Sequence, residues 1–396
     1  TKQLQSSKID IDLFGLEFLK WKFWGFFIKI LYDKNNLQKT FMLNFIINHQ
    51  RFKKQFSQNE LTEYLDDENR IKRFPQYSKN YYNFFNTYAK EKYKLVKNDC
   101  LCGYDNDIVL SLTDRHCVNF ITVVCKNCGL IRARDYFRNE DVEDFYKNFY
   151  RTNAYSENYK TISPADLFNK QKKESKFKYD LLNEYKIKPL NELKIIDLGG
   201  GVGGVLDHFS NDNEKYLFDF YDPYLNFAKT KGIKSVKGGL DKIDFKVDII
   251  ILSHVIEHWS DFKNEIQKLI DIQKKNETLN YIEFPGVDSI KKGRREGDVL
   301  GDIHIPHVYY FTSYVFENIM NRYGFEKVYS DTLIKSIYIY TGNKKNLVNY
   351  YETVKYDLIY AEKTRRFQIF KNCIKFLIPL FILKIIRKIR NKKIKF

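Results

Sequence analysis

Four cysteines in the first half of the chain have the spacing of a metal site. Cys100 and Cys102 form one pair, Cys125 and Cys128 form a second, and a glycine follows each pair. A glycine there permits the tight turn that aims both thiolates inward. Four thiolates suit a tetrahedral zinc ion, and four protein ligands leave no open position. We therefore expect a structural Zn²⁺ at Cys100, Cys102, Cys125 and Cys128.

Two alternatives to this ligand set are open. The first pair is one residue shorter than the usual C-x-x-C, so His116 or Cys117 could replace one of its members. Disulfide bonds are the other alternative. However, charges at Glu17, Lys20 and Lys22 interrupt the apolar run that a secretory signal would need. We therefore predict a cytoplasmic protein, in which disulfides are rare.

A glycine-rich segment further along has the composition of an anion-binding loop. It follows a predicted strand, 193–198, and contains Gly199, Gly200, Gly201 and Gly203. Glycines let a ligand approach the backbone, and we expect the loop to open a helix that ends near Phe209 and favours an anionic group at its N-terminus. Asp197, just before the glycines, suits a ligand with an amino-acid head group better than a dinucleotide pyrophosphate.

The next predicted strand, 216–221, supplies a second acidic residue. It ends beside Asp222, where a carboxylate can bind both hydroxyls of a ribose. The alternative for Asp222 and Pro223 is a simple turn. A dehydrogenase is the alternative enzyme class, but only if Asp197 does not bind an amino-acid head group.

The elements that position these residues alternate between apolar strands and helical stretches over residues 160–345, which is typical of a parallel α/β sheet. We expect two further strands at 247–252 and 279–283. Residues 96–150 have short alternating runs such as 118–124, which predict a small β module. The chain of 396 residues is 43% hydrophobic, which excludes a disordered or fibrous protein.

The two ends of the chain differ in composition from the central segment of strands and helices. Residues 1–95 are dense in aromatic side chains and predict helices that need a partner: the core, a second subunit or a membrane interface. Residues 363–396 contain twelve Lys or Arg and no acidic residue, in a chain of net charge +17. After Pro379 the pattern predicts a basic amphipathic helix suited to an anionic membrane surface. Packing on the N-terminal arm and RNA binding are the alternatives.

Three motifs in this order resemble the class I S-adenosylmethionine-dependent methyltransferases: the glycine loop, Tyr221-Asp222-Pro223, and the segment 248–258. The resemblance implies that Asp197 and the loop hold the methionine end of S-adenosylmethionine and that Asp222 holds its ribose. The segment 239–241, just before the strand predicted at 247–252, would meet the adenine. The implied cofactor-binding residues are Asp197, Gly199, Gly200, Gly201, Gly203, Asp222, Pro223, Asp241, Ser253 and His254.

The cysteine segment and two later motifs extend the resemblance to a bacterial group of methyltransferases with an N-terminal zinc ribbon. These motifs are Phe284-Pro285-Gly286 and the segment 304–312. The resemblance covers residues 96–345, although Cys117 stands where the group usually has glycine. It implies methylation of a sugar in a surface-glycan precursor or in a nucleotide- or lipid-linked sugar.

Methyl transfer to an alcohol is an in-line displacement in which the acceptor loses a proton. Histidine suits this role near neutral pH, and four histidines lie in the two segments predicted to border the cleft: His254, His258, His304 and His307. We predict His258 as the base and His307 as the second candidate, with Glu257 orienting a histidine or binding a substrate hydroxyl. Alternatively, these histidines only fill the wall of the cleft.

We therefore predict an α/β fold, a Rossmann-like class I methyltransferase sheet with helices on both faces. The expected domains are a helical N-terminal arm (1–95), a zinc-ribbon module (96–150), a methyltransferase domain (151–345) and a basic helical tail (346–396). The predicted partners are a sugar or glycan acceptor and an anionic membrane surface bound through the tail, with the enzyme peripheral on the cytoplasmic membrane. The N-terminal helices could pair with a second copy or another protein.

Two other functions are less favoured. An RNA methyltransferase would fit zinc and net basicity, but the ribbon carries acidic residues where a dense basic stripe is expected. A non-catalytic scaffold that retains the cofactor fold is disfavoured by the intact Asp197, glycines and Asp222.

Overall fold

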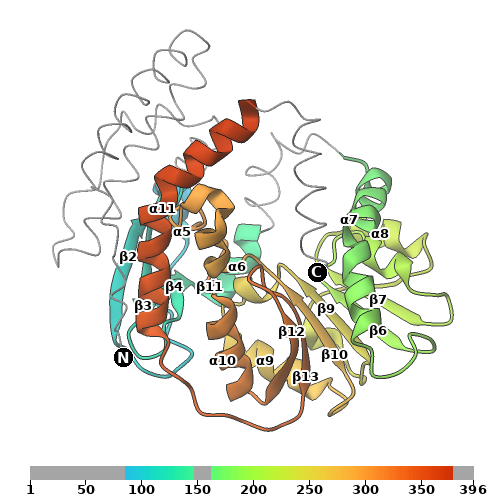
Figure 1. Ribbon diagram of the computed structural model, residues 1–396. Coiled ribbons are helices and arrows are strands. Elements are labelled where there is room, and N and C mark those ends of the chain that lie inside the picture. The colour runs from blue at the N-terminus through green and yellow to red at the C-terminus, as the bar shows by residue number, and fades with distance from the viewer. Residues whose placement is uncertain (1–84, 117, 147–161, 378–396) are drawn as a thin grey trace, which may run out of the picture. The chain divides into compact units, whose positions relative to one another are not determined.

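The computed structural model describes residues 85–116, 118–146 and 162–377 (Figure 1). Most of the predicted N-terminal arm lies outside these residues, as do Cys117 and the amphipathic segment after Pro379. At the start of the described part, a π-helix η1 and a short helix α5 precede the first strand. Their bounds are η1 (Phe85–Ala89), α5 (Lys90–Lys92) and β1 (Leu95–Lys97).

A seven-stranded sheet forms the centre of the fold, in the order β12-β13-β10-β9-β6-β7-β8. The five strands from β10 to β8 are parallel, whereas β13 runs antiparallel to both β10 and β12. The strands are β6 (Lys194–Leu198), β7 (Glu214–Asp219), β8 (Lys234–Lys237), β9 (Ile249–Ser253), β10 (Leu279–Glu283), β12 (Phe325–Ser330) and β13 (Lys335–Tyr340).

Helices cover both faces of this sheet, so its inner strands are apolar on both sides. On one face Ile195 and Ile251 pack in a core with α7, η3 and α8. On the other face Phe316 of α10 packs edge-on against Tyr338. The helices are α7 (Pro164–Glu184), α8 (Asp222–Lys229), α9 (Phe262–Asp271) and α10 (Ser313–Arg322), with the 3₁₀ helices η3 (Gly204–His208), η4 (Leu240–Lys242), η5 (Ile256–His258), η6 (Val287–Lys292) and η7 (Arg294–Gly297). The predicted α/β fold class is confirmed for the described residues.

A second sheet carries the cysteines, with its four strands in the order β11-β4-β3-β2. All its pairings are antiparallel. Its last strand, β11, comes from beyond residue 150, so this sheet joins segments from two of the predicted domains. A two-stranded sheet pairs β1 with β5. The elements are β2 (Asp107–Thr113), β3 (Asn119–Cys125), β4 (Ile131–Ala133), β5 (Asp135–Phe137), α6 (Asn139–Phe145) and β11 (Tyr309–Tyr310).

The helix α11 (Tyr351–Leu377) contacts both parts of the described structure. A Cβ atom at Gly129 would lie 3.0 Å from Val354, so this glycine lets the helix approach the cysteine sheet. Further along the helix, Asp357 pairs with Lys291 of η6 at 2.8 Å. The first part of the predicted tail is therefore helical. Among the described residues, no helix is long and apolar enough to cross a membrane.

Two sequence predictions differ from the structure in this region. The strand predicted at 216–221 is β7, which ends at Asp219. The helix predicted from the glycine loop to near Phe209 is present, but it is the five-residue 3₁₀ helix η3 rather than an α-helix. Gly203 enters it with a left-handed φ of +76°, and Phe209 returns to extended backbone, which limits the helical segment to five residues.

Close packing of α7 on the glycine loop depends on Gly204. A Cβ atom at this position would lie 2.7 Å from the backbone nitrogen of Lys172 and 2.8 Å from the carbonyl oxygen of Phe168. Both contacts are with the backbone of α7 and cannot relax by rotation of a side chain. Gln171 of the same helix accepts a hydrogen bond from the Gly204 N–H group at 3.2 Å.

Candidate active site and cysteine site

The candidate active site lies at the carboxyl ends of β6, β7 and β9. The strands that follow β6 extend the sheet to one side through β7 and β8, whereas β9 and β10 extend it to the other side. Open α/β sheets bind their ligands at the carboxyl ends of the strands where the order reverses in this way. The loop after β6 and the segment after β9 therefore lie at the expected ligand site.

The glycine loop after β6 is built around the side chain of Asp197. This residue is 2% exposed, and a Cβ atom at Gly200 would lie 2.0 Å from its Oδ2 atom. Gly199 and Gly201 have φ values of +67° and +63°, a region that favours glycine. The loop can cover the carboxylate only because these positions lack side chains.

Burial raises the pKa of Asp197 to about 7. Lys178 lowers this pKa and Asp219 raises it, but removal of the carboxyl group from water has the largest effect. A ligand with an ammonium group would stabilise the ionised form. This environment suits the predicted role of Asp197 at the methionine end of the cofactor, which stays a prediction.

Asp219 is an acidic residue of this site that the sequence analysis missed. It ends β7, is buried, and accepts hydrogen bonds from the backbone N–H groups of Gly201, Phe220 and Tyr221. Asp219 thus ties the glycine loop to the turn after β7. The signal was present in the sequence, but the predicted strand boundary fell two residues too late.

Asp222 and Pro223 begin α8 rather than ending a strand. The Asp222 carboxylate is 61% exposed and pairs with Lys237 at 2.7 Å. Asp241 lies in η4, where its Oδ1 atom accepts a hydrogen bond from the Gly239 N–H group at 3.3 Å. The predicted ribose and adenine residues therefore lie on the β7 and β8 side of the sheet, with their carboxylates exposed to solvent.

A polar network that the sequence analysis missed connects Ser253 to α7 and β10. Lys178 Nζ donates a hydrogen bond to Ser253 Oγ at 2.6 Å and pairs with Glu283 at 2.9 Å. Burial raises the pKa of Glu283, but Lys178, His254 and Tyr281 together hold it below its usual value. The sequence does not single out Lys178, because it is one of five lysines in α7.

The buried carboxylate of Glu257 is the centre of a histidine cluster. Its Oε1 atom lies 3.3 Å from His254 Nδ1, 3.8 Å from His258 Nε2 and 3.9 Å from His307 Nε2. Its Oε2 atom is buried and has no hydrogen-bond partner among the described residues. The structure thus brings together the three predicted catalytic residues, Glu257, His258 and His307, with His254 beside them.

Hydrogen bonding fixes the tautomer of His258. Its Nδ1 atom lies 2.7 Å from the carbonyl oxygen of Pro306 and 2.9 Å from the hydroxyl group of Tyr146. Because a carbonyl oxygen only accepts hydrogen bonds, Nδ1 carries the hydrogen. The neutral ring therefore has its lone pair on Nε2, the atom nearest Glu257.

The other histidines of the cluster differ in role. His304 Nδ1 donates to the carbonyl oxygen of Asp302 at 3.0 Å, and its ring packs against that of His307 at 3.9 Å. Burial holds the pKa of both rings well below the usual value. The His304 ring therefore supports the His307 ring by packing against it. His254 has a left-handed φ of +58°, and its N–H group donates to the Glu283 carbonyl oxygen at 2.7 Å.

Residues 149–330 match a family model described as a methyltransferase domain. This part of the chain is similar to a methyltransferase domain. The enzyme class that we predicted from the sequence, an S-adenosylmethionine-dependent methyltransferase, is thereby confirmed. The matched region contains the whole of the glycine loop, the histidine cluster and β6 to β12. The zinc ribbon and the glycan substrate stay predictions.

Solved structures are only weakly similar to the chain. A methyltransferase from Aquifex aeolicus is 16% identical over 45% of this chain and 96% of its own, with a TM-score of 0.32. The YcgJ protein from Bacillus subtilis is 15% identical over 38% of this chain and 69% of its own, with a TM-score of 0.29. The plantazolicin methyltransferase BpumL is 16% identical over 56% of this chain and 88% of its own, with a TM-score of 0.35. No curated protein matches the chain. Similarity this low supports no argument about the substrate of the methyltransferase.

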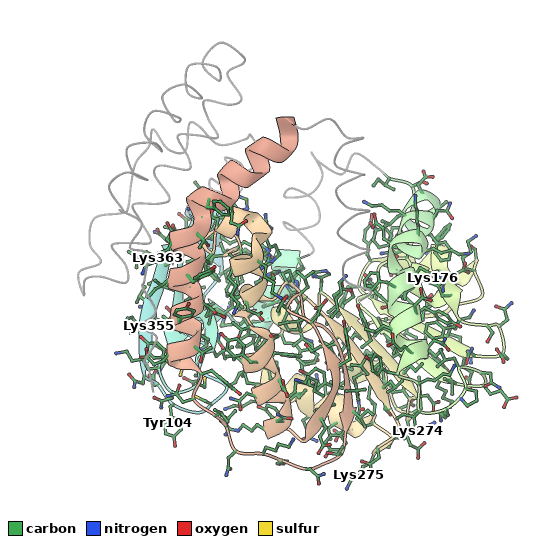
Figure 2. All side chains as sticks on the ribbon, viewed as in Figure 1. Tyr104, Lys176, Lys274, Lys275, Lys355 and Lys363 are labelled. Carbon is green, nitrogen blue, oxygen red and sulfur yellow. The ribbon has the colours of Figure 1, made fainter. Side chains whose placement is uncertain are left out.

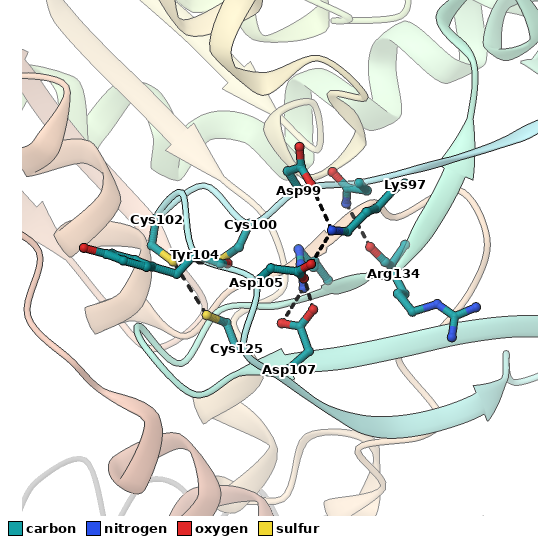
Figure 3. A network of polar contacts seen from close by, with 12 residues as sticks. Lys97, Asp99, Cys100, Cys102, Tyr104, Asp105, Asp107, Cys125 and Arg134 are labelled. Atoms are coloured by element: carbon teal, nitrogen blue, oxygen red, sulfur yellow. Dashed lines mark hydrogen bonds and ion pairs between the residues drawn. The ribbon is translucent and has the colours of Figure 1, made fainter.

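The four predicted zinc ligands converge in the second sheet. Figure 3 shows Cys102 facing Cys125, with Cys100 beside them, and Cys102 lies 3.6 Å from Cys125 and 3.4 Å from Cys100 between sulfur atoms. Cys100 and Cys128 are 3.5 Å apart, and all four thiols are buried and free of disulfides. Four sulfur atoms bonded to one zinc ion at about 2.3 Å lie about 3.8 Å apart, so this donor set fits zinc.

The surroundings of the cysteines favour an anionic centre. Arg132 is fully buried and forms two hydrogen bonds with Asp107, at 3.0 and 2.9 Å, within electrostatic range of Cys100 and Cys125. A zinc ion bound by four thiolates carries a net negative charge, which a buried guanidinium group offsets. His116, an alternative ligand in the sequence, lies instead against Arg115, whose Nε atom is 3.1 Å from its Nε2.

The cysteine sheet also holds the segment that carries His307. Tyr309 and Tyr310 of β11 pair with β4, and the Ala133 N–H group donates to the Val308 carbonyl oxygen at 2.9 Å. On the other side of this segment, the Val308 N–H group donates to the Glu257 carbonyl oxygen at 2.8 Å. The cysteine sheet is therefore bonded to the histidine cluster through one short strand.

Binding of S-adenosylmethionine should depend on the ionisation of Asp197. Its carboxyl group has a pKa of about 7 in the unliganded protein, and only the ionised form attracts the cationic cofactor. Affinity should therefore weaken as pH falls below 7, by up to about tenfold per pH unit, and level off above it. Calorimetric titration at several pH values measures this. In an Asp197→Asn variant, affinity should be low at every pH, and a wild type without pH dependence would contradict the assignment.

The cysteine site should lose its metal when one thiolate is removed. We expect wild-type protein to retain about one zinc ion per chain on a chelating column, because a closed four-thiolate site exchanges slowly. Cys125→Ser should lose it, and Cys117→Ser should keep it, because four other thiols already converge. Elemental analysis of the eluted protein measures both. Zinc retained by Cys125→Ser, or lost by Cys117→Ser, would overturn the ligand set.

Proposed function

We propose that this methyltransferase O-methylates a sugar hydroxyl, in a surface-glycan precursor or in a nucleotide- or lipid-linked sugar. The observation that supports this most directly is the cluster of Glu257, His258 and His307 at the carboxyl end of β9, beside the glycine loop. An alcohol attacks poorly until it loses its proton, so a positioned imidazole suits an oxygen acceptor. The resemblance to ribbon-bearing sugar methyltransferases points to the same substrate class.

Asp197 and the glycine loop are the proposed site for the methionine end of S-adenosylmethionine. For the ribose, Asp222 is better placed than Asp219. Both carboxylate oxygens of Asp219 already accept hydrogen bonds from backbone N–H groups. The Asp222 carboxylate is exposed, and its ion pair with Lys237 on the surface can be replaced by hydrogen bonds to the ribose hydroxyls. Ser253 ends β9 and His254 follows it, on the side of the histidine cluster. When bound, the cofactor supplies a methyl group on a sulfonium ion.

His258 is the proposed base. Its Nδ1–H group is held by the Pro306 carbonyl oxygen, so Nε2 is free to take the proton of the acceptor hydroxyl. Glu257 lies against the same Nε2 atom and stabilises the imidazolium that forms. His307 faces the same carboxylate from the loop before β11 and is the second candidate for the proton.

A structural zinc ion at the four cysteines would stabilise the candidate active site through the cysteine sheet. It would join the segment before β2 to the turn between β3 and β4 at one end of the cysteine sheet, whose strand β4 pairs with β11. Because β11 directly follows His307, a rigid cysteine sheet keeps that ring beside Glu257. Four protein ligands leave no position for a substrate, so we assign this metal no part in the chemistry.

The tail is the proposed site of attachment to an anionic membrane, where a lipid-linked acceptor would be found. Tyr356, Tyr360 and Phe367 are exposed on α11, and their spacing puts them on one face with Lys363. Figure 2 shows Lys355 and Lys363 on this helix. Exposed aromatic side chains favour the interface between water and lipid, and basic residues favour anionic headgroups.

If His258 is the base, its removal should slow methyl transfer without weakening the binding of the cofactor product. His258→Ala should bind S-adenosylhomocysteine as the wild type does, but transfer methyl groups about 10²- to 10⁴-fold more slowly, because the acceptor proton has no base. The assay follows labelled methyl transfer from S-adenosylmethionine to a panel of nucleotide sugars and lipid-linked glycans. His208→Ala, whose ring contacts the Lys172 carbonyl oxygen in α7, is the matched control. An active His258→Ala variant would remove this residue from the mechanism.

Membrane attachment can be tested by flotation with vesicles. The full chain should float with vesicles that contain an anionic lipid, and it should stay at the bottom with neutral vesicles or in high salt. A chain ending at residue 377 should bind the anionic vesicles much more weakly. Equal flotation of the full and shortened chains would show that residues 378–396 play no part.

A further inference from the structure

We propose that Glu257, His258 and His307 bind a divalent metal ion at a second site, separate from the four cysteines. One ligand atom from each residue lies within 4.8 Å of the other two. The Glu257 Oε1 atom lies 3.8 Å from His258 Nε2 and 3.9 Å from His307 Nε2. Two atoms bonded to one ion at about 2.1 Å lie at most about 4.2 Å apart, so the cluster is close to binding geometry before any movement.

The hydrogen bonding of His258 is that of a metal ligand. Histidine ligands nearly always donate their second ring N–H group to a carboxylate or a carbonyl oxygen, which fixes the tautomer. In this protein the Pro306 carbonyl oxygen accepts from His258 Nδ1 at 2.7 Å and leaves the Nε2 lone pair toward Glu257. The Tyr146 hydroxyl group lies 2.9 Å from the same Nδ1 atom.

The Glu257 carboxylate points independently to a cation. Its side chain is 1% exposed, and its Oε2 atom has no hydrogen-bond partner within the described part of the chain. A buried carboxylate is costly unless it is paired or coordinates a metal. The nearest lysine network, at Lys178, is engaged by Glu283 and Ser253 instead. A cation bound by Oε1 and the two imidazoles would neutralise this buried carboxylate, and bidentate binding would also satisfy Oε2.

The ligand set indicates the class of ion. Two imidazole nitrogens and one carboxylate oxygen suit Zn²⁺, Fe²⁺ or Mn²⁺, and three protein ligands leave positions open. His254, whose Nδ1 atom is 3.3 Å from the same carboxylate oxygen, has a side chain that is 55% exposed, so solvent reaches the cluster on this side. This site therefore differs from the cysteine site in both donor type and accessibility.

A metal ion with open coordination positions at the carboxyl ends of the strands also indicates which kind of sugar is the acceptor. This step rests on the proposed function. Two neighbouring hydroxyl groups of one sugar can occupy two open positions of one ion. Binding to the cation lowers the pKa of a hydroxyl group, so with metal bound the cation replaces the free His258 imidazole as the cause of proton loss. The preferred acceptor is then a sugar with a vicinal diol rather than one with an isolated hydroxyl.

Cobalt titration of the full-length, chelator-treated protein tests the metal site without reference to activity. We expect one Co²⁺ per chain to bind with weak visible bands and without the intense near-ultraviolet absorption of thiolate-bound cobalt. Glu257→Gln and His307→Ala should each lose this equivalent. Glu265→Gln, on the surface of α9, and His208→Ala are the matched controls and should retain it. Zinc retained at the four cysteines, measured by elemental analysis, reports in every variant that the protein is folded.

The outcomes separate this proposal from the proposed function. If wild type and Glu257→Gln bind the same number of Co²⁺ ions, or if every bound ion absorbs as a thiolate complex, the second site is refuted whatever the enzyme methylates. If the extra ion binds to wild type and is lost in both variants, the site stands even where no sugar acceptor is methylated. In an active enzyme, removal of this ion with a chelator should slow transfer to diol acceptors, because only the free His258 imidazole is left to take the proton, while S-adenosylhomocysteine still binds.

Discussion

The burial of one carboxylate at the end of the central strand determines the rest of the site. Asp197 lies under the glycine loop, where a single added methyl group at Gly200 would overlap its oxygen. Position 200 must therefore be glycine, and the left-handed φ values at 199, 201 and 203 favour glycine there too. Gly204 then lets α7 approach, and α7 brings Lys178 to Ser253 and Glu283. A charged group taken out of water thus organises three strands and a helix around the place where a cationic cofactor is expected.

The cysteine sheet is joined to the same site through β11. This strand of two residues completes the cysteine sheet, while the loop before it carries His307 and supplies the Pro306 carbonyl oxygen that orients His258. Local order in the cysteine sheet therefore affects the two imidazoles that face Glu257. The arrangement explains why a module without any substrate position of its own is joined to a methyltransferase domain.

The hydrophobic periodicity of the sequence predicted the positions of the strands well, but it did not predict which distant side chains contact one another. The strand at 279–283 has the predicted bounds, and the four cysteines converge as their spacing indicated. The end of β7 was misplaced because Phe220 and Tyr221 continue its aromatic pattern past Asp219. Lys178 and Glu283 were missed because their contact joins α7 to β10, and a hydrophobic pattern shows which face is buried but not which distant side chain lies opposite. The histidine cluster was predicted, whereas its buried, unpaired Glu257 oxygen required coordinates.

A crystal structure with S-adenosylhomocysteine bound would test the central claim most directly. The account predicts that the homocysteine amino group lies at Asp197 over the glycine loop and that the ribose hydroxyls meet Asp222. The sulfur atom should face the space beside Glu257, His258 and His307, close enough for a methyl group to reach an acceptor held there. A ligand bound elsewhere, or a sulfur atom turned away from the histidine cluster, would contradict it.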